Sequence, residues 1–152
     1  MEINRARRYK HPFTMVWIDL DNFKRVNDCF GHTTGDTLLR LVARTIQENI
    51  RATDTLARLG GDEFAILLPE TGRDVAEVIM QKVQKINLDI MREHGWPVTL
   101  SIGVVTFTSS PSTVDETLRI ADRLMYAAKN NGKNGVQYQV FGMKEWMTTA
   151  TA

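Results

Sequence analysis

The run Gly60-Gly61-Asp62-Glu63-Phe64 sets two adjacent carboxylates beside two glycines. Glycine tolerates the positive φ angles of tight turns and, without a Cβ, lets a ligand approach the backbone. Because apolar runs flank Gly60 and Gly61, we predict a β-hairpin with Asp62 and Glu63 at its tip. Such a tip is suited to phosphate and metal ions. Taken alone, a Gly-Gly-Asp-Glu run is more often a solvated acidic turn.

A second pair of carboxylates, Asp19 and Asp21, follows the apolar run MVWI. Carboxylates therefore emerge where a buried strand reaches the edge of its sheet, a common place for ligand sites. For Asp21 we favour a local role, as a turn residue or as the N-cap of the next helix. Asp19, together with Asp62 and Glu63, supplies hard oxygen ligands. Mg²⁺ typically takes one or two carboxylates plus substrate phosphates, so we predict a magnesium site here.

Hydrophobic periodicity predicts the elements that would position these carboxylates. A buried strand is predicted over residues 13–20, the two strands of the hairpin over 55–59 and 64–68, a further strand over 98–107 and an edge strand over 135–141. Helices are predicted over about 2–10, 22–30, 34–50, 73–94 and 112–131. This order implies an α/β (α+β) fold, with a mixed, mainly antiparallel sheet of roughly five strands flanked by helices.

The later helices and the end of the chain give further expectations. In the helix over 73–94 one apolar stripe is predicted to face the core, formed by Val75, Val78, Ile79, Val83, Ile86 and Ile90. Ser112 with Asp115 resembles a capping box that starts the last helix. Residues 142–152 are predicted to be a tail, because the final MTTATA has nothing to bury.

The composition limits the class of protein. A chain of 152 residues with 43% apolar residues can form a single buried core, so we expect one domain. Nineteen basic and eighteen acidic residues leave a charge of +1, which excludes a general field that would attract nucleic acid or an anionic membrane. The one cysteine, Cys29, is expected to be a buried reduced thiol, which favours a cytoplasmic location.

Four ordered segments resemble the signatures of the GGDEF family of diguanylate cyclases, at that family's spacings. They are DLDNFKRVNDCFGHTTGD (19–36), RATDTLARLGGDEF (51–64), SIGV (101–104) and YAAKNNGKN (126–134). The resemblance implies a fold related to nucleotidyl cyclase and polymerase palm domains. It also implies an enzyme that condenses two GTP into cyclic di-GMP, with pyrophosphate leaving.

The resemblance assigns a metal site with two Mg²⁺ or Mn²⁺ ions. Its ligands would be Asp19, the Leu20 carbonyl, Asp62 and Glu63, and its catalytic residues would be Asp19, Asp62 and Glu63, with Glu63 also a candidate base. The ribose 3′-hydroxyl of one GTP would attack the α-phosphate of the second. Two metal ions would stabilise the attacking and leaving oxygens.

Guanine would be read by Asn27 and Asp36, which match the family's base-reading pair. A carboxylate only accepts hydrogen bonds, which suits the N1–H and N2–H₂ edge of guanine. Asn27 can instead be a helical surface amide, and Asp36 can be a helix N-cap. For Asp36 alone we weigh the two roles about equally.

The triphosphate would contact the Phe23 backbone N–H, the side chains of Lys24 and Lys129, and the turn of Gly60 and Gly61. Each lysine taken alone is more often a solvated helix charge. At Lys133 the family usually has arginine, so a point charge replaces a bidentate fork, and we expect weaker phosphate affinity.

Product inhibition is implied by Arg51-Ala52-Thr53-Asp54, which matches the family's RxxD site for cyclic di-GMP. The alternative is a helix-terminal ion pair. Arg58, just before the Gly-Gly turn, is expected to brace the hairpin or to contact the product.

The implied partners follow from one GTP bound per domain. Cyclisation then needs a transient antiparallel homodimer, brought together by covalently attached sensory domains of a larger protein, soluble or membrane-attached. The rival hypothesis is a GGDEF module that senses GTP or cyclic di-GMP without turnover. Family domains open with a DxLTGLxNR segment that walls the nucleotide pocket. We expect residues 1–152 to be a single GGDEF domain without that segment.

Overall fold

The computed structural model describes residues 11–109 and 113–142. In chain order its elements are β1 (Phe13–Asp21), α2 (Phe23–Phe30), α3 (His32–Asn49), β2 (Thr55–Gly60), β3 (Glu63–Leu68), α4 (Arg73–Glu93), β4 (Thr99–Phe107), α5 (Val114–Asn130) and β5 (Gly135–Phe141). This order agrees with the predicted one. The expected helix over 2–10, Ser112 and the tail over 143–152 lie outside the described residues.

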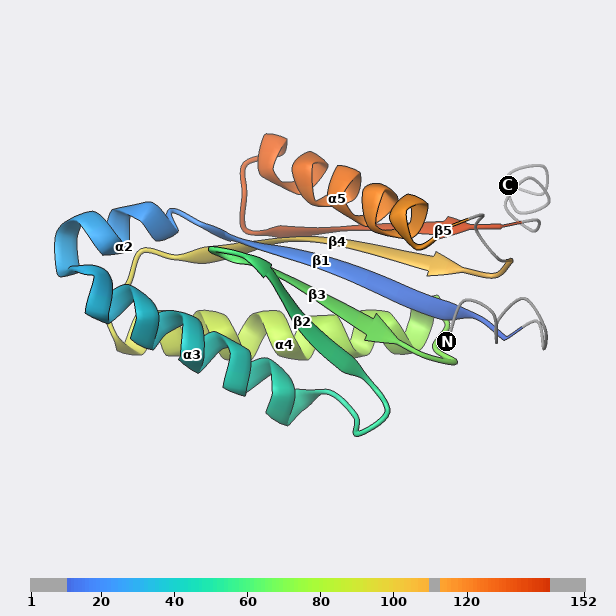
Figure 1. Cartoon of the computed structure of the whole chain (residues 1–152), viewed down its shortest axis with the longest axis horizontal. Helices are drawn as coiled ribbons and strands as arrows, with labels where there is room; N and C mark the ends of the chain where they lie inside the picture. Colours follow the sequence, from blue (N-terminus) through green and yellow to red (C-terminus); the bar gives the residue numbers. More distant parts are fainter. Residues whose placement is uncertain (1–10, 110–112, 143–152) are drawn as a thin grey trace.

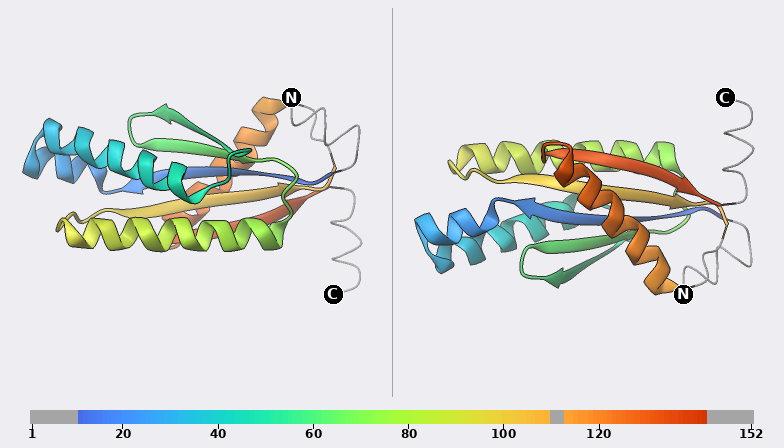
Figure 2. Two further views of the ribbon diagram at one scale, coloured as in Figure 1. Left: turned by 90° about the horizontal axis from the view of Figure 1, so that it is seen from below. Right: turned by 90° about the horizontal axis from the view of Figure 1, so that it is seen from above.

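A five-stranded sheet, in the order β2-β3-β1-β4-β5, forms the middle layer. Its β2–β3, β3–β1 and β1–β4 pairs are antiparallel, and β4–β5 is parallel. Helices α3 and α4 cover one face of the sheet and α5 crosses the other (Figures 1 and 2). The predicted α+β fold with a mixed, mainly antiparallel sheet is therefore confirmed.

The central strand β1 divides its side chains between the two faces of the sheet. Even positions such as Val16 and Ile18 belong to the core under α3 and α4. Odd positions such as Met15 and Trp17 pack with the smaller cluster under α5. Because side chains alternate along a strand, the odd position Asp19 also faces α5.

Helix α5 lies close to the sheet because Gly103 of β4 has no side chain. A Cβ added there would lie 2.2 Å from the Ala121 carbonyl oxygen and 2.5 Å from the Met125 nitrogen, both in the backbone of α5. This close packing brings α5 to the sheet, and Lys129 of α5 lies within reach of Asp19 and Asp21 at the carboxyl end of β1.

Helix α4 turns toward the core a stripe that matches the predicted one only in part. Val83 is buried, and Ile79 and Ile90 pack against the core as predicted. Val75 is 50% exposed and Val78 is 66% exposed, so for these two residues the prediction was wrong. The buried row is Ala76, Met80, Val83, Asn87 and Met91. This row repeats at helical spacing and includes a polar residue, Asn87, whose Nδ2 donates to the Val83 carbonyl at 2.8 Å. A local main-chain acceptor lowers the cost of burying this amide, which apolar periodicity does not register.

Two expected helix caps also differ. Helix α3 begins at His32, so Asp36 lies inside the helix and is not its N-cap. Thr113 caps α5, with its Oγ1 accepting from the Glu116 N–H at 3.0 Å.

The prediction of a buried thiol is wrong, because Cys29 is exposed on α2. Among the described residues, no helix is long and apolar enough to cross a bilayer.

Candidate active site

The carboxylates of β1 and of the β2–β3 hairpin meet through strand register. Asp19 lies directly opposite Glu63 in the antiparallel β1–β3 pair. The Leu20 N–H donates to the Asp62 carbonyl at 3.1 Å, which fastens the hairpin tip to the end of β1. Asp19, Asp62 and Glu63, which the sequence analysis placed in one site, therefore come together although 43 residues separate Asp19 from Asp62.

These carboxylates repel one another. Burial, followed by the negative charges of Asp62 and Glu63, raises the pKa of Asp19 from 3.8 to about 6, although Lys129 opposes the shift. Burial and the charge of Glu63 also raise the pKa of Asp122 on α5. A cation at this place would relieve the repulsion.

Lys129 of α5 is one such cation. Its Nζ lies 3.5 Å from Asp19 Oδ1 and 3.3 Å from Asp21 Oδ1. Burial alone would lower the pKa of the Lys129 ammonium, but Asp19 and Asp21 together raise it above its ordinary value.

Asp21 has no N-cap role, which corrects our prediction. The N-cap of α2 is Asn22, which has a left-handed φ of 66° and makes no side-chain cap. The Asp21 side chain is fully buried and accepts from Thr99 Oγ1 at 2.7 Å and Ser101 Oγ at 2.7 Å. It also accepts from Lys129 Nζ and from the Asn134 N–H at 3.1 Å. Asp21 thereby ties β1 to β4 and to the turn between α5 and β5.

A divalent metal fits part of this donor set. Within 11–109 and 113–142, no group of three or more Asp, Glu, His or Cys side chains is arranged to hold a metal by itself. Asp19 and Glu63 nevertheless face each other across β1 and β3, and burial together with the charges of Asp62 and Glu63 raises the pKa of Asp19 in spite of Lys129. Two carboxylates, the Leu20 carbonyl and substrate phosphates would make a donor set of the kind Mg²⁺ prefers.

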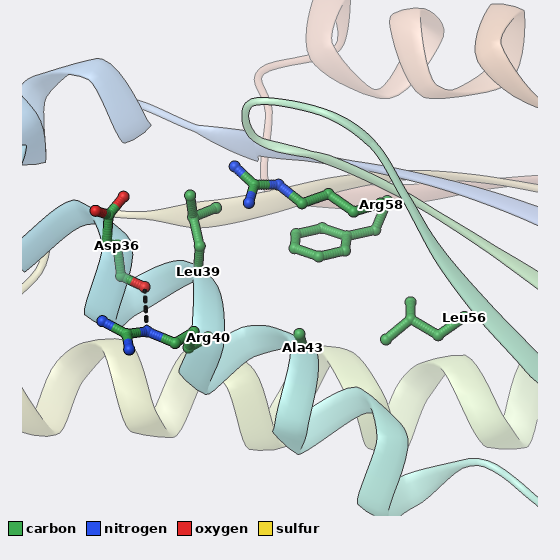
Figure 3. A pocket seen from close by; sticks show the side chains of 7 residues that line it. Asp36, Leu39, Arg40, Ala43, Leu56 and Arg58 are labelled. Atoms are coloured by element: carbon green, nitrogen blue, oxygen red, sulfur yellow. Dashed lines mark hydrogen bonds between the residues drawn. The ribbon is translucent and has the colours of Figure 1, made fainter.

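A cavity of about 680 Å³ opens between α3 and the hairpin. Its lining residues are Asp36, Leu39, Arg40, Ala43, Leu56, Arg58 and Phe64. Figure 3 shows Asp36 and Arg40 at one end of the cavity and Arg58 reaching over it from the hairpin. Asn27 of α2 approaches Asp36, because a Cβ added to the neighbouring Gly35 would lie 1.9 Å from Asn27 Oδ1. The two expected guanine readers therefore come from adjacent helices and lie near each other.

Arg58 braces the hairpin, the first of its two expected roles. Its Nε and Nη2 donate to the Gly61 carbonyl at 3.1 and 2.7 Å. An arginine fork on one carbonyl restrains the Gly60-Gly61 turn, and with it the adjacent Asp62.

The expected phosphate contacts gather around the start of α2. Phe23 is buried. Because it is the first residue of α2, its N–H lies at the helix N-terminus, where backbone N–H groups favour anions. Lys24 is exposed on the same turn. Lys133 Nζ donates to Asn22 Oδ1 at 3.2 Å, which places a second lysine of the α5–β5 segment beside this terminus.

The RxxD residues lie apart from the carboxylates, in the turn before β2. The Asp54 side chain is fully buried and accepts from Arg51 N at 2.7 Å, Nε at 3.0 Å and Nη2 at 2.8 Å. Arg51 Nη2 also donates to the Thr71 hydroxyl. The Arg51 side chain remains 43% exposed. This geometry makes an ion pair that ties two turns together, with one arginine face open to solvent.

The fold and this site define a class: a palm-like α+β domain that gathers carboxylates and lysines at one end of its central strand. The family model described as "Diguanylate cyclase, GGDEF domain" matches residues 1–135. Diguanylate cyclase DosC of Escherichia coli is 38% identical over 140 residues, which cover 90% of this chain and 30% of that protein. The bifunctional diguanylate cyclase/cyclic di-GMP phosphodiesterase MucR of Pseudomonas aeruginosa is 40% identical over 137 residues, 88% of this chain and 20% of that protein.

Solved structures agree. The active GGEEF domain of a diguanylate cyclase from Vibrio cholerae superposes with a TM-score of 0.80 at 30% identity, covering 90% of this chain and 88% of that one. The GGDEF domain of DgcB from Caulobacter crescentus, in complex with c-di-GMP, gives 0.78 at 26% identity and covers 89% and 82%. The chain belongs to the GGDEF domain family of diguanylate cyclases. It spans less than a third of the length of the curated relatives DosC and MucR.

Proposed function

We propose that this domain condenses two GTP molecules into cyclic di-GMP with release of pyrophosphate. The observation that carries the proposal is the meeting of Asp19, Asp62 and Glu63 at the end of β1, with Lys129 facing them from α5. Such a site suits a triphosphate, because its carboxylates would attract metal ions and its lysine would neutralise phosphate oxygens.

The metal ligands in this proposal are Asp19, the Leu20 carbonyl, Asp62 and Glu63. Bound Mg²⁺ or Mn²⁺, two ions per site, would stabilise the attacking 3′ oxygen and the leaving pyrophosphate oxygen. Glu63 would also accept the proton of the 3′-hydroxyl.

Substrate selection would use the cavity between α3 and the hairpin. Asp36 and Asn27 would pair with the guanine edge, and the Gly60-Gly61 turn would let the triphosphate pass close to the backbone. The Phe23 N–H with Lys24, Lys129 and Lys133 would hold the phosphates. Their placement around the start of α2 supports this assignment.

Turnover would require two domains. One site holds one GTP, so the second nucleophile must come from a facing domain in a transient antiparallel homodimer. The regions of DosC and MucR that this chain does not cover are consistent with attached modules that control this encounter.

Product inhibition would use the exposed face of Arg51. A guanidinium can fork onto a phosphate or onto the Hoogsteen edge of guanine. Asp54 is less available to accept hydrogen bonds from cyclic di-GMP, because three Arg51 groups already donate to its oxygens. Arg58 would act through the hairpin that it braces.

One incubation tests the proposed activity. The chain at high concentration, with GTP and Mg²⁺, should form cyclic di-GMP and pyrophosphate, and excess EDTA should stop the reaction. A sample that binds GTP but forms no product at any protein concentration would refute the cyclase and favour a nucleotide-sensing module.

A further inference from the structure

Trp17 of β1 contacts the carboxylate to which we assign the metal and base roles. Its indole Nε1 donates to Glu63 Oε2 at 2.7 Å. This hydrogen bond joins positions that lie diagonally across the β1–β3 pair, because Trp17 is opposite Ala65 and Asp19 is opposite Glu63. The Glu63 side chain therefore lies on the same face as both Trp17 and Asp19.

Strand register makes room for the indole. On one side the cross-strand neighbour of Trp17 is Ala65 of β3, and on the other it is Gly103 of β4. Both are small, and Gly103 also admits the α5 backbone. Trp17 packs against the apolar cluster under α5, whose buried members include Met15, Val105 and Ala121, so contacts that do not involve Glu63 also hold its side chain.

Glu63 needs such a donor because its other neighbours are negatively charged. Asp19 faces it from β1, and Asp122 is close enough on α5 for the two charges to interact. An indole N–H only donates, so it cannot compete for a metal ion. A carboxylate has two oxygens, and a bond to Oε2 leaves Oε1 available for a metal ion.

We propose that Trp17 is a positioning residue for Glu63, holding one oxygen so that the other meets a metal ion shared with Asp19. The inference rests on the proposed function, since the metal site belongs to it. Outer groups that hydrogen-bond a metal ligand orient it, and their loss commonly weakens metal binding ~10- to 100-fold. The hydrogen bond should therefore persist when the metal binds.

The first test measures Mn²⁺ alone binding to the full chain, without nucleotide, by calorimetry. Trp17→Phe keeps an aromatic ring but removes the donor, and it should weaken Mn²⁺ binding about 10-fold or more. Trp96→Phe is the control, because Trp96 is a buried tryptophan that belongs to the cluster on the opposite face of the sheet. This variant should bind Mn²⁺ as the parent does.

The second test follows the indole N–H signals in a ¹H–¹⁵N spectrum. If Trp17 had only a structural role, its indole signal would not respond to a change at Glu63. The Trp17 signal is identified by its loss in Trp17→Phe. It should move in Glu63→Gln, while the Trp96 signal stays, and it should keep its hydrogen-bonded shift when Mg²⁺ is added to the parent. This measurement remains decisive if Trp17→Phe fails to fold, because the chain has three tryptophans and the variants Trp96→Phe and Trp146→Phe identify the other two indole signals.

The outcomes separate the inference from the proposed function. Parent protein that binds no Mn²⁺, either alone or with a non-hydrolysable GTP analogue that supplies the phosphate ligands, would overturn the metal site and the inference with it. If the parent binds Mn²⁺ and Trp17→Phe binds it equally or more tightly, the inference alone is overturned. The indole would then have no effect on metal binding or would oppose it. A Trp17 signal unmoved by Glu63→Gln would also overturn it.

Discussion

The buried carboxylate of Asp21 accepts a hydrogen bond from Lys129 at 3.3 Å, and the same lysine lies 3.5 Å from Asp19. Asp21, at the end of β1, therefore holds the ammonium group of Lys129 in the position where it faces Asp19. Asp21 also accepts from Thr99, Ser101 and the Asn134 N–H, so it fixes the turn that carries Lys133. This arrangement makes Lys129 and Lys133, the lysines to which we assign phosphate binding, depend on a residue that need not touch substrate.

Asp21→Asn should therefore raise KM for GTP and destabilise the fold. The groups around Asp21 are hydrogen-bond donors, so the amide nitrogen of asparagine, itself a donor, would leave some of them without an acceptor. Leaving buried groups unsatisfied costs about 1–3 kcal/mol. Urea unfolding and initial rates measure the two effects. Asp28→Asn, on the exposed side of α2, is the control and should change neither. If the Asp21→Asn protein has the stability and KM of the parent, Asp21 does not hold Lys129 and the α5–β5 turn in place.

The raised pKa of Asp19 predicts how metal-free stability depends on pH. Its pKa in the folded protein is about 6, above the ordinary 3.8, so the folded state binds this proton more tightly than the unfolded chain. Stability from this group is therefore present at low pH and is lost as pH rises through about 6.

Asp19→Asn removes that charge and should stabilise the metal-free protein at about pH 8 by ~1–2 kcal/mol, less than the full shift because solvent screens part of the repulsion. The gain over the parent should shrink toward about pH 4. Urea unfolding in EDTA across this range measures it. A gain that is the same at every pH would mean that the burial and repulsion of an ionised Asp19 are not its cause.

Glu63→Gln should abolish most turnover while keeping the fold, because it removes one charge from the site at nearly constant volume. Loss of one preorganised electrostatic contact commonly lowers the rate ~10²- to 10³-fold. Cyclic di-GMP formation measures the rate and circular dichroism checks the fold. Glu48→Gln, exposed on α3, serves as the control. Near-parental activity in Glu63→Gln would exclude the role assigned to Glu63.

Much of the fold could be predicted because its signals are local. The apolar run of β1, the glycines of the hairpin and the helical stripes of α3 and α5 are each legible within a few residues of sequence. The placement of Asp19 beside Glu63 was also predicted, from motif spacing. The helix caps were less accurate: Asp21 and Asp36 are good capping residues by type, but Asp21 ends β1 and binds β4 and Lys129, and Asp36 lies inside α3.

The residues that sequence reasoning missed are connected by register between distant strands. Asp21 meets Ser101, 80 positions away, and Trp17 meets Glu63, 46 positions away. No local pattern fixes those pairs. One signal was available: Trp17, Asp19 and Asp21 alternate along a strand, so an alternation argument places all three on one face.

Guanine preference should depend on Asp36. A site that pairs its carboxylate with the guanine N1–H and N2–H₂ leaves this acceptor unpaired when adenine enters. Asp36→Ala should therefore weaken GTP binding far more than ATP binding, by calorimetry on both nucleotides. Asp74→Ala, exposed on α4, is the control. If the Asp36→Ala protein binds both nucleotides as the parent does, the base is read elsewhere.

The last prediction separates an inhibitory site from a structural ion pair at Arg51. The guanidinium holds buried Asp54 and the Thr71 hydroxyl while 43% of the side chain stays exposed. If that open face also binds product, cyclic di-GMP should bind the parent, and binding should weaken ~10-fold or more in Arg51→Ala because a charge-assisted fork is lost.

Arg51→Ala also leaves the buried Asp54 charge without its partner, so its stability must be measured beside its affinity. Arg51→Lys addresses this problem: it keeps a positive charge near Asp54 but cannot form the bidentate fork, so it should retain more stability than Arg51→Ala and still bind product weakly. Because the site leads into β2, occupancy should slow turnover without competing with GTP. Equal calorimetric binding by the parent and both variants, or no binding by the parent, would leave the ion pair as the only role of Arg51.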